Sequence, residues 1–213
     1  MSDELLDRLT ADLKPTPPRA LQARLFGWAG LGAVLSAIIM LLWLGPRPDM
    51  MQAPGTMMFW TKFGYTAIFA IVGGIAALNL ARPGGRLGPQ VLVLAALVLL
   101  VGAGGLVQLM LMGPDQMSNL VMGNTALRCP FYIVALSAPI YGAIVLAMRR
   151  AAAPTNPTLA GFAAGLFAGG AGVWIYAFHC TENGMPFIAI WYTAGVLATA
   201  LLGALIGRFA LRW

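Results

Sequence analysis

The side chains best suited to chemistry are few, and they gather around two cysteines. The segment AFHCTENGMPF, residues 177–187, places the only histidine, His179, beside Cys180, with Glu182 two positions later. The second cysteine, Cys129, begins the segment CPFYIVALSAP. Two thiols can form a disulfide when their Cα atoms lie roughly 4.4 to 6.8 Å apart, or they can bind a soft metal ion together with imidazole and carboxylate groups. We take these residues as a candidate redox or metal-sensing site, in which Cys129, Cys180 and His179 would hold the metal ion.

An apolar composition decides which elements position these groups. Of the 213 residues, 60% are hydrophobic and 9% are charged, a balance that soluble domains of this size do not show. A helix needs about 20 apolar residues to cross the roughly 30 Å hydrocarbon core of a bilayer. The sequence therefore predicts an all-α membrane protein, a bundle of six transmembrane helices. The expected spans are residues 25–44, 60–80, 90–112, 127–148, 159–178 and 187–209.

The basic residues predict the orientation of this bundle. With six spans, both termini and the second and fourth loops share one side, which holds ten Lys and Arg residues against three on the other side. Because cytoplasmic loops carry an excess of Lys and Arg, we expect both termini in the cytoplasm. The net charge of +6 then indicates contacts with anionic membrane lipids rather than direct binding of nucleic acid. The ten are Arg8, Lys14, Arg19, Arg24, Arg82, Arg86, Arg149, Arg150, Arg208 and Arg212, and the three are Arg47, Lys62 and Arg128.

The alternation of helix direction brings the two thiols to one membrane face. Cys129 begins the fourth expected span and Cys180 ends the fifth, so both lie at the outer face, where an oxidising compartment lets a disulfide persist. Arg128, next to Cys129, would favour the thiolate by electrostatic attraction. Two interpretations stay open: a permanent disulfide that joins two helices, and a redox or metal switch.

Small residues indicate how the spans pack. Gly161, Gly165 and Gly169 recur at four-residue spacing in the fifth span, and the sixth offers Gly203 and Gly207. Helices in lipid associate through such faces because their backbones can approach closely. We expect these faces to pack within a compact bundle, although the same glycines are compatible with a homodimer.

The N-terminal segment is the main stretch outside the expected spans. Residues 1–24 form a cytoplasmic tail and linker, and residues 25–213 form the transmembrane domain. The tail predicts a short amphipathic helix, because leucines recur at helical spacing among acidic residues. Its acidic polar side would be repelled by anionic lipid, so a basic protein partner is favoured over the chain's own basic loops. The expected contact residues are Leu5, Leu6, Leu9 and Leu13 with Asp7 and Asp12.

Motifs of enzymes are missing from the sequence. It has no glycine-rich phosphate loop before a lysine, no GxSxG elbow and no Cys-x-x-Cys pair. We therefore expect no catalytic residues and no obligatory cofactor, apart from a soft metal ion that binds transiently. The alternative from another class is a small multi-pass transporter or metal-export protein, although the span centres lack the ionisable groups that such proteins use. A thiol oxidoreductase is a third alternative.

Three segments carry a resemblance to a known family. ELLDRLTADLKP near the start, RCPFYIVALSAP at the fourth span and HCTENGMPFIAIWYTAG near the end resemble the NrsF-type anti-sigma factors. These are six-span proteins of the bacterial inner membrane that negatively regulate sigma-F, an extracytoplasmic-function sigma factor. The resemblance implies that the N-terminal segment holds the sigma factor at the membrane. It also implies that the outer cysteines, here Cys129 and Cys180, register stress and release it.

Overall fold

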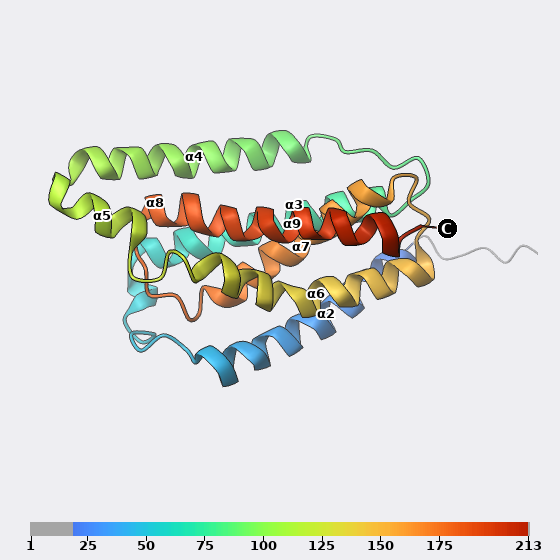
Figure 1. The fold of residues 1–213 in the computed structure, drawn as a ribbon, viewed down its shortest axis with the longest axis horizontal. Coiled ribbons are helices and arrows are strands. Elements are labelled where there is room, and N and C mark those ends of the chain that lie inside the picture. The colour runs from blue at the N-terminus through green and yellow to red at the C-terminus, as the bar shows by residue number, and fades with distance from the viewer. Residues whose placement is uncertain (1–18, 213) are drawn as a thin grey trace, which may run out of the picture.

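The described part of the chain is all-helical. The computed structural model describes residues 19–212, with residues 114 and 115 by their backbone only, and this part contains helices without strands (Figure 1). The six expected spans are confirmed as six helices that are long and apolar enough to cross a membrane. Two of them include a π-helical turn, η1 Met40–Leu44 and η3 Ile188–Tyr192. The elements are α2 Ala20–Ile39 with η1, α3 Met57–Leu80, α4 Gln90–Leu111, α6 Cys129–Ala151, α7 Pro157–Tyr176, and α8 Met185–Phe187 continuing through η3 into α9 Thr193–Ala210.

Several boundaries differ from the expected ones. The first long helix, α2, begins at Ala20 and so takes in residues that the sequence had assigned to the linker. The interval after α4 was expected as a loop but contains the helix α5 Pro114–Met122. Proline in the first turn and Gly123, with φ of 50°, after the last turn are ordinary signals for the start and end of a helix. The expected N-terminal amphipathic helix, with all its proposed contact residues, lies outside the described residues.

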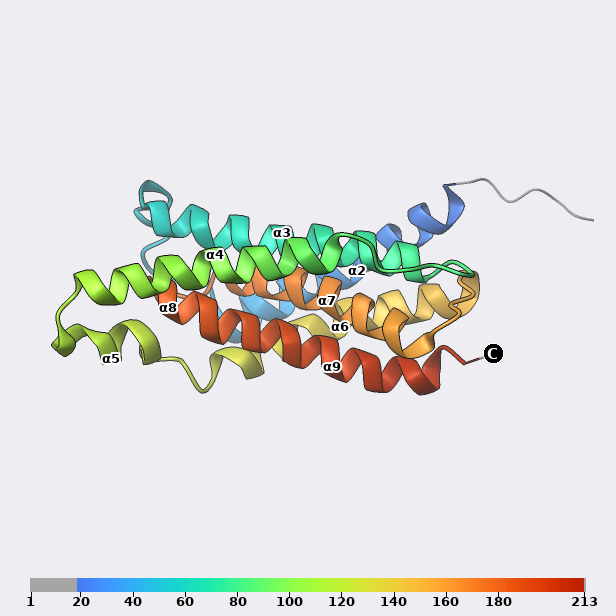
Figure 2. The same cartoon turned by 90° about the horizontal axis from the view of Figure 1, so that it is seen from above.

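Helix α7 forms the centre of the bundle. It packs against α3, α6 and α9, while α2 lies against α6 (Figures 1 and 2). Helix α4 lies at the edge and contacts α3 and the short α8. The most apolar window of α7 is 67% buried, whereas that of α4 is 22% buried. Large apolar side chains such as Leu42 and Leu92 therefore remain on the outside, exposed by 84% and 74%.

Glycines allow α7 to occupy this central position. A Cβ atom added at Gly161 would lie 2.7 Å from the Cα atom of Gly207, and one added at Gly165 would lie 2.7 Å from the Cα atom of Ala200. On another side of α7, a Cβ atom at Gly170 would lie 2.8 Å from the Cα atom of Ala70 on α3. Real Cβ atoms do not approach so closely, so the backbones pack directly on one another. The expected packing of the glycine faces within one chain is confirmed.

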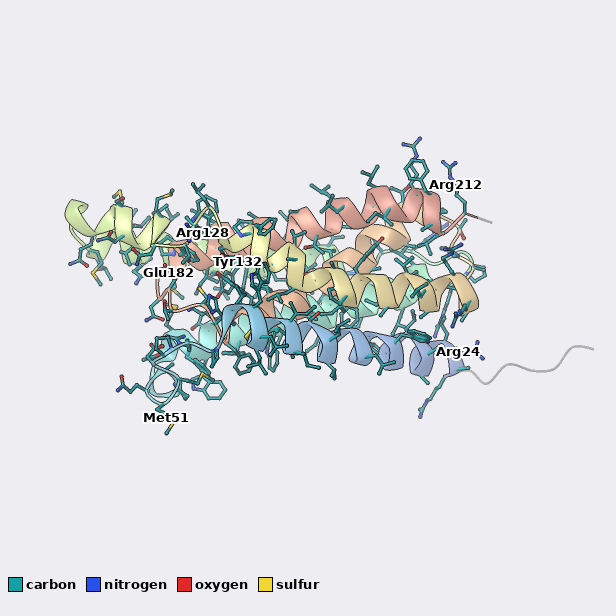
Figure 3. The ribbon with its side chains drawn as sticks, turned by 60° about the horizontal axis from the view of Figure 1, so that its bottom comes forward. Arg24, Met51, Arg128, Tyr132, Glu182 and Arg212 are labelled. Atoms are coloured by element: carbon teal, nitrogen blue, oxygen red, sulfur yellow. The ribbon has the colours of Figure 1, made fainter. Side chains whose placement is uncertain are left out.

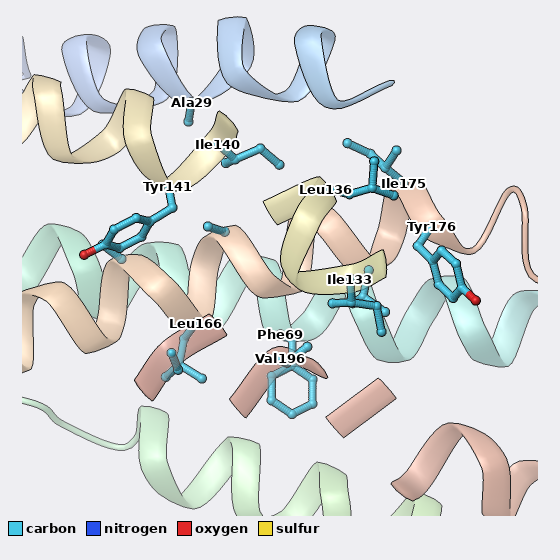
Figure 4. Close-up of a cluster of buried hydrophobic side chains, with 14 of the residues drawn as sticks. Ala29, Phe69, Ile133, Leu136, Ile140, Tyr141, Leu166, Ile175, Tyr176 and Val196 are labelled. Carbon is cyan, nitrogen blue, oxygen red and sulfur yellow. The ribbon is translucent and has the colours of Figure 1, made fainter. Parts of the chain in front are cut away.

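Apolar side chains of α6 form part of the buried core. Ile133, Leu136 and Ile140 are fully buried, and Figure 4 shows them with Leu166 and Val196 in one cluster. Pro139 lies inside α6, where it removes one helical hydrogen bond. Three residues earlier, the Leu136 carbonyl accepts a hydrogen bond of 2.6 Å from the Ser36 hydroxyl of α2. This polar contact fixes α2 against α6 in an otherwise apolar interface.

The two ends of the bundle differ in chemistry. We call one the thiol end, which comprises residues 45–56, 113–129 and 177–184, and the other the terminal end, which comprises residues 19–24, 81–89, 152–156 and 211–212. Figure 3 shows Arg24 and Arg212 together at the terminal end, with Met51, Arg128 and Glu182 at the opposite end. Both termini of the described chain thus lie at the same end, as an even number of spans requires.

A larger residue at the α7–α9 contact should destabilise the bundle. Gly165→Val would force apart two backbones, and we expect it to lower the free energy of unfolding by about 1–3 kcal/mol. The unfolding temperature of the purified protein in detergent measures this. Gly142→Ala on α6 is the matched control, because nothing lies within 4 Å of a Cβ atom added there. An equal response of both variants would contradict the packing described.

Candidate functional site

Both cysteines lie at the thiol end and are buried. Cys129 is the first residue of α6 and is 0% exposed, and Cys180 follows α7 and is 3% exposed. The Cys180 amide donates to the carbonyl of Tyr176 at 3.1 Å, which continues the chain direction of α7 for one further turn. Both residues are free thiols. The structure therefore brings the two thiols together at one end, as the alternation of spans predicted.

Lys62 is the cation next to these thiols. Its ammonium is fully buried and donates to the Cys180 carbonyl at 3.1 Å. It lies within electrostatic range of both thiols. The sequence had suggested Arg128 for this role, but Arg128 is exposed at the surface. The sequence had placed Lys62 only on the side with three basic residues, and the packing of α3 against α7 encloses it.

Two tyrosine rings enclose the thiols from other elements. Tyr176 ends α7 and Tyr192 ends the π-helical turn η3, and their ring centroids lie 6.0 Å apart. The Tyr176 hydroxyl lies near Cys129 and the Tyr192 hydroxyl lies near Cys180, but neither pair has the geometry of a hydrogen bond. Figure 4 shows the Tyr176 hydroxyl directed away from the apolar cluster around Ile133.

Arg47 closes the site from the first loop. Its backbone amide donates to the Phe178 carbonyl at 3.0 Å, and its side chain is buried. The guanidinium Nε and Nη2 atoms donate to the two carboxylate oxygens of Asp49 at 2.6 and 2.7 Å. This bidentate pair lowers the pKa of the Asp49 carboxyl and raises the pKa of Arg47.

His179 and Glu182 tie the segment around Cys180 to neighbouring loops. The His179 Nδ1 atom shares a hydrogen bond of 2.9 Å with the Gly45 carbonyl, just after η1, where a φ of 72° at Gly45 turns the chain. The Glu182 carboxylate accepts from the Asn124 amide at 2.8 Å and from the Thr125 hydroxyl at 3.2 Å. Both side chains are thus engaged in holding the three loops of the thiol end together.

A metal site is not assembled by the described side chains. Among residues 19–212, no group of three or more His, Cys, Asp and Glu side chains is placed to hold a metal ion. The hydrogen bond to the Gly45 carbonyl uses only the Nδ1 atom of His179 and leaves Nε2 with its lone pair, but the described geometry does not place this ring with the two thiols as a set of metal ligands. The described geometry instead offers two thiols beside buried cations, which suits reactions and binding events that involve negative charge.

Sequence reasoning missed four members of this site, and one signal could have identified two of them. Arg47 and Lys62 are two of only three Lys and Arg residues on the side that the sequence predicts to be outside. Because basic residues are rare on that side, their presence there indicates a specific structural or functional role. Tyr176 and Tyr192 lie in apolar helical runs and carried no such signal. The π-helical turn that presents Tyr192 is likewise invisible in the sequence, although such turns occur often at functional sites.

The Arg47–Asp49 pair predicts a pH dependence of stability. Because folding lowers the pKa of Asp49, the pair stabilises the protein above the ordinary carboxyl pKa and the stabilisation is lost as the pH falls through the folded-state pKa. Asp49→Asn should therefore lower the unfolding temperature near neutral pH and flatten its fall between about pH 5 and about pH 3. Thermal unfolding across this pH range measures both effects, and an unchanged acid slope would contradict the account.

Comparisons with known proteins show which family the chain belongs to. The family model described as "NrsF: Negative regulator of sigma F" matches residues 9–213. The "Anti-sigma-F factor NrsF" of Caulobacter vibrioides (strain NA1000 / CB15N) is 39% identical over 218 residues, which cover 100% of this chain and 99% of that protein. The "Probable anti-sigma-F factor NrsF" of Azospira oryzae (strain ATCC BAA-33 / DSM 13638 / PS) is 40% identical over 198 residues, 92% of this chain and 91% of the relative. No solved structure matches. The chain belongs to the NrsF family of negative regulators of sigma F, the anti-sigma-F factors.

Proposed function

We propose that this protein is a membrane-bound anti-sigma factor that holds an extracytoplasmic-function sigma factor through its N-terminal segment. It releases the sigma factor when Cys129 and Cys180 react with an oxidant or bind a metal ion. The observation that supports the proposal is the position of the two thiols at one end of the bundle and of the start of the described chain at the other.

Three features support a position across the bacterial inner membrane. The six apolar helices run side by side, and large apolar side chains cover their outside. An aqueous solvent would not favour such a surface, whereas the acyl chains of lipids do. Arg82 and Arg86 at the terminal end, with Arg149 and Arg150 in the adjoining last turn of α6, then face the cytoplasm and its anionic lipid leaflet.

The sigma factor is proposed to bind at the cytoplasmic side. The tail residues Leu5, Leu6, Leu9 and Leu13 offer an apolar edge, and Asp7 and Asp12 offer negative charge to a basic partner. A short amphipathic helix is marginal alone in water and gains stability from a groove that buries its apolar edge. The relatives are named anti-sigma-F factors, which supports a sigma factor as the partner.

Sensing is proposed to act on the loops of the thiol end. An oxidant that takes two electrons from the thiols, with loss of both protons, would join Cys129 to Cys180 as a disulfide. The segment around Cys180 is tied to α3 through Lys62 and to the first loop through His179 and Gly45. A change in the thiols therefore acts on several helices at once. About 3 kcal/mol of differential binding would lower the affinity for the partner roughly 150-fold.

A variant without the two thiols tests whether binding of the sigma factor and its release depend on different parts of the protein. Cys129→Ala with Cys180→Ala should keep the sigma factor bound to membranes and abolish its release by oxidant or metal, because the responding sulfur atoms are gone. Alanine is preferred to serine because both sites are buried and would not accommodate a new hydroxyl well. Co-purification of the sigma factor with membranes, with and without diamide or cadmium, measures the response.

A second variant controls for the partner contact. Replacement of Leu5, Leu6, Leu9 and Leu13 by alanine leaves the thiols intact and should lose the sigma factor under all conditions. If the cysteine variant still released its partner on treatment, the sensing proposal would be wrong. If the leucine variant still retained it, the tail would not be the binding segment.

A further inference from the structure

The terminal end of the bundle carries a small pocket with two arginines in its wall. The pocket has a volume of about 160 Å³ and is lined by Arg149, Pro154, Ala210, Leu211 and Arg212. Arg149 lies in the last turn of α6, Ala210 ends α9, and the other three residues follow the ends of these two helices. The lining thus comes from the ends of two helices, where the chain leaves the apolar part of the bundle.

This pocket combines positive charge with apolar surface. Arg149 and Arg212 are exposed, whereas Pro154 is buried and Leu211 is 3% exposed. A guanidinium group can bind a carboxylate through two parallel hydrogen bonds, and an aliphatic side chain gains from contact with the apolar part of the lining. The pocket therefore suits a segment in which acidic and apolar side chains lie close together in the sequence.

The chain itself holds such a segment on the same side. Of the seven Asp and Glu residues in the sequence, Asp49, Asp115 and Glu182 belong to the segments of the thiol end. The other four precede the described residues, where they stand among leucines. We call residues 1–18 the acidic segment, because it has four acids against two bases. Its acids are Asp3, Glu4, Asp7 and Asp12.

Covalent geometry allows the acidic segment to reach the pocket. The Arg150 guanidinium lies 5.4 Å from the centroid of the Trp28 ring, so the last turn of α6 lies beside the early part of α2. Trp28 comes eight residues after Ala20, the first residue of α2, which is about 12 Å along a helix. Asp12 comes seven residues before Arg19, and seven extended residues span up to about 25 Å.

We infer that the acidic segment docks on the pocket of Arg149 and Arg212 when no partner is bound, and that the sigma factor must displace it. The second half of this inference rests on the proposed function, in which the same segment holds the sigma factor. The two contacts are alternatives that compete for one segment. Docking would hold a released segment on the bundle and so slow its return to the partner.

Tethering makes a weak contact sufficient. A short flexible tether gives an effective concentration on the order of 1 mM, so a contact with a dissociation constant of about 0.1 mM would be formed in roughly nine molecules out of ten. The apparent affinity for the partner falls with the fraction of molecules that can bind it, here about tenfold.

The test measures the distance between the acidic segment and the bundle in the full-length protein without its partner. In a background with Cys129→Ala and Cys180→Ala, spin labels are attached to Thr10→Cys and to Pro83→Cys, an exposed position of the terminal end outside the pocket. Pulsed electron paramagnetic resonance in a phospholipid-free detergent gives the distance distribution. We expect a narrow distribution that becomes broad at high salt, because salt screens exposed charges.

Arginine variants locate the contact. Arg149→Ala with Arg212→Ala should broaden the distribution as high salt does. Arg82→Ala with Arg86→Ala is the matched control, because it removes the same charge at the same end of the bundle from residues that do not line the pocket. The control should keep the narrow distribution.

A charge reversal tests the pairing directly. Asp7→Arg with Asp12→Arg should broaden the distribution, and adding Arg149→Glu with Arg212→Glu to that variant should make it narrow again. Restoration by the second pair requires that these residues meet, since each pair of changes alone would weaken the contact.

Three results would overturn docking. They are an equally narrow distribution after Arg149→Ala with Arg212→Ala, an equal broadening by the Arg82 and Arg86 control, and a broad distribution after the full charge reversal. If the narrow distribution in detergent were lost in vesicles that contain phosphatidylglycerol, an anionic lipid would occupy the pocket in membranes and the inference would be wrong there.

The sigma factor separates this inference from the proposed function. Its addition should replace the narrow distribution by a different one, and Arg149→Ala with Arg212→Ala should bind it about tenfold more tightly. If the sigma factor left the distribution unchanged while the charge reversal restored it, docking would stand and the proposed contact between the tail and the partner would be wrong.

Discussion

A buried ammonium, Lys62, that no carboxylate among the described side chains contacts is the constraint around which the thiol end is organised. Lys62 enters from α3 and contacts the carbonyl of Cys180, so the segment after α7 must pass close to that helix. The hydrogen bond between His179 and the Gly45 carbonyl and the one that the Asn124 amide donates to Glu182 then hold the neighbouring loops around it. In an apolar bundle, polar groups that leave water must find partners within the protein, and the thiol end supplies such partners to Lys62, His179 and Glu182.

Helix α7 relates this end to the rest of the molecule. Its glycines let the backbones of α3 and α9 approach directly, so that small shifts are passed on rather than absorbed by flexible side chains. Its last residue, Tyr176, belongs to the thiol site, and its first turn lies beside the terminal end. Because closely packed elements move as units, a packed helix of this kind couples the thiol end to the terminal end.

The sequence was sufficient to predict the features that depend on the hydropathy pattern and on the number of long helices. Hydropathy located the six long helices, an even number of them placed the termini at one end, and alternation brought Cys129 and Cys180 to the other. The glycine faces were visible because small residues recur at helical spacing. Tertiary contacts decided the rest. A lysine near the start of a span can reach toward the interface or turn inward, and only the packing of α3 on α7 settles that choice for Lys62.

The central claim is that the thiol end and the terminal end lie on opposite sides of one membrane, with the thiol end outside. In a background with Cys129→Ala and Cys180→Ala, single cysteines are introduced at Met51, which is 95% exposed at the thiol end, and at Ala153, which is exposed at the terminal end. Intact cells are treated with a maleimide that does not cross the inner membrane. The account predicts that Met51→Cys is labelled and that Ala153→Cys is labelled only after the membrane is permeabilised. Labelling of both from one side, or the reverse pattern, would contradict it.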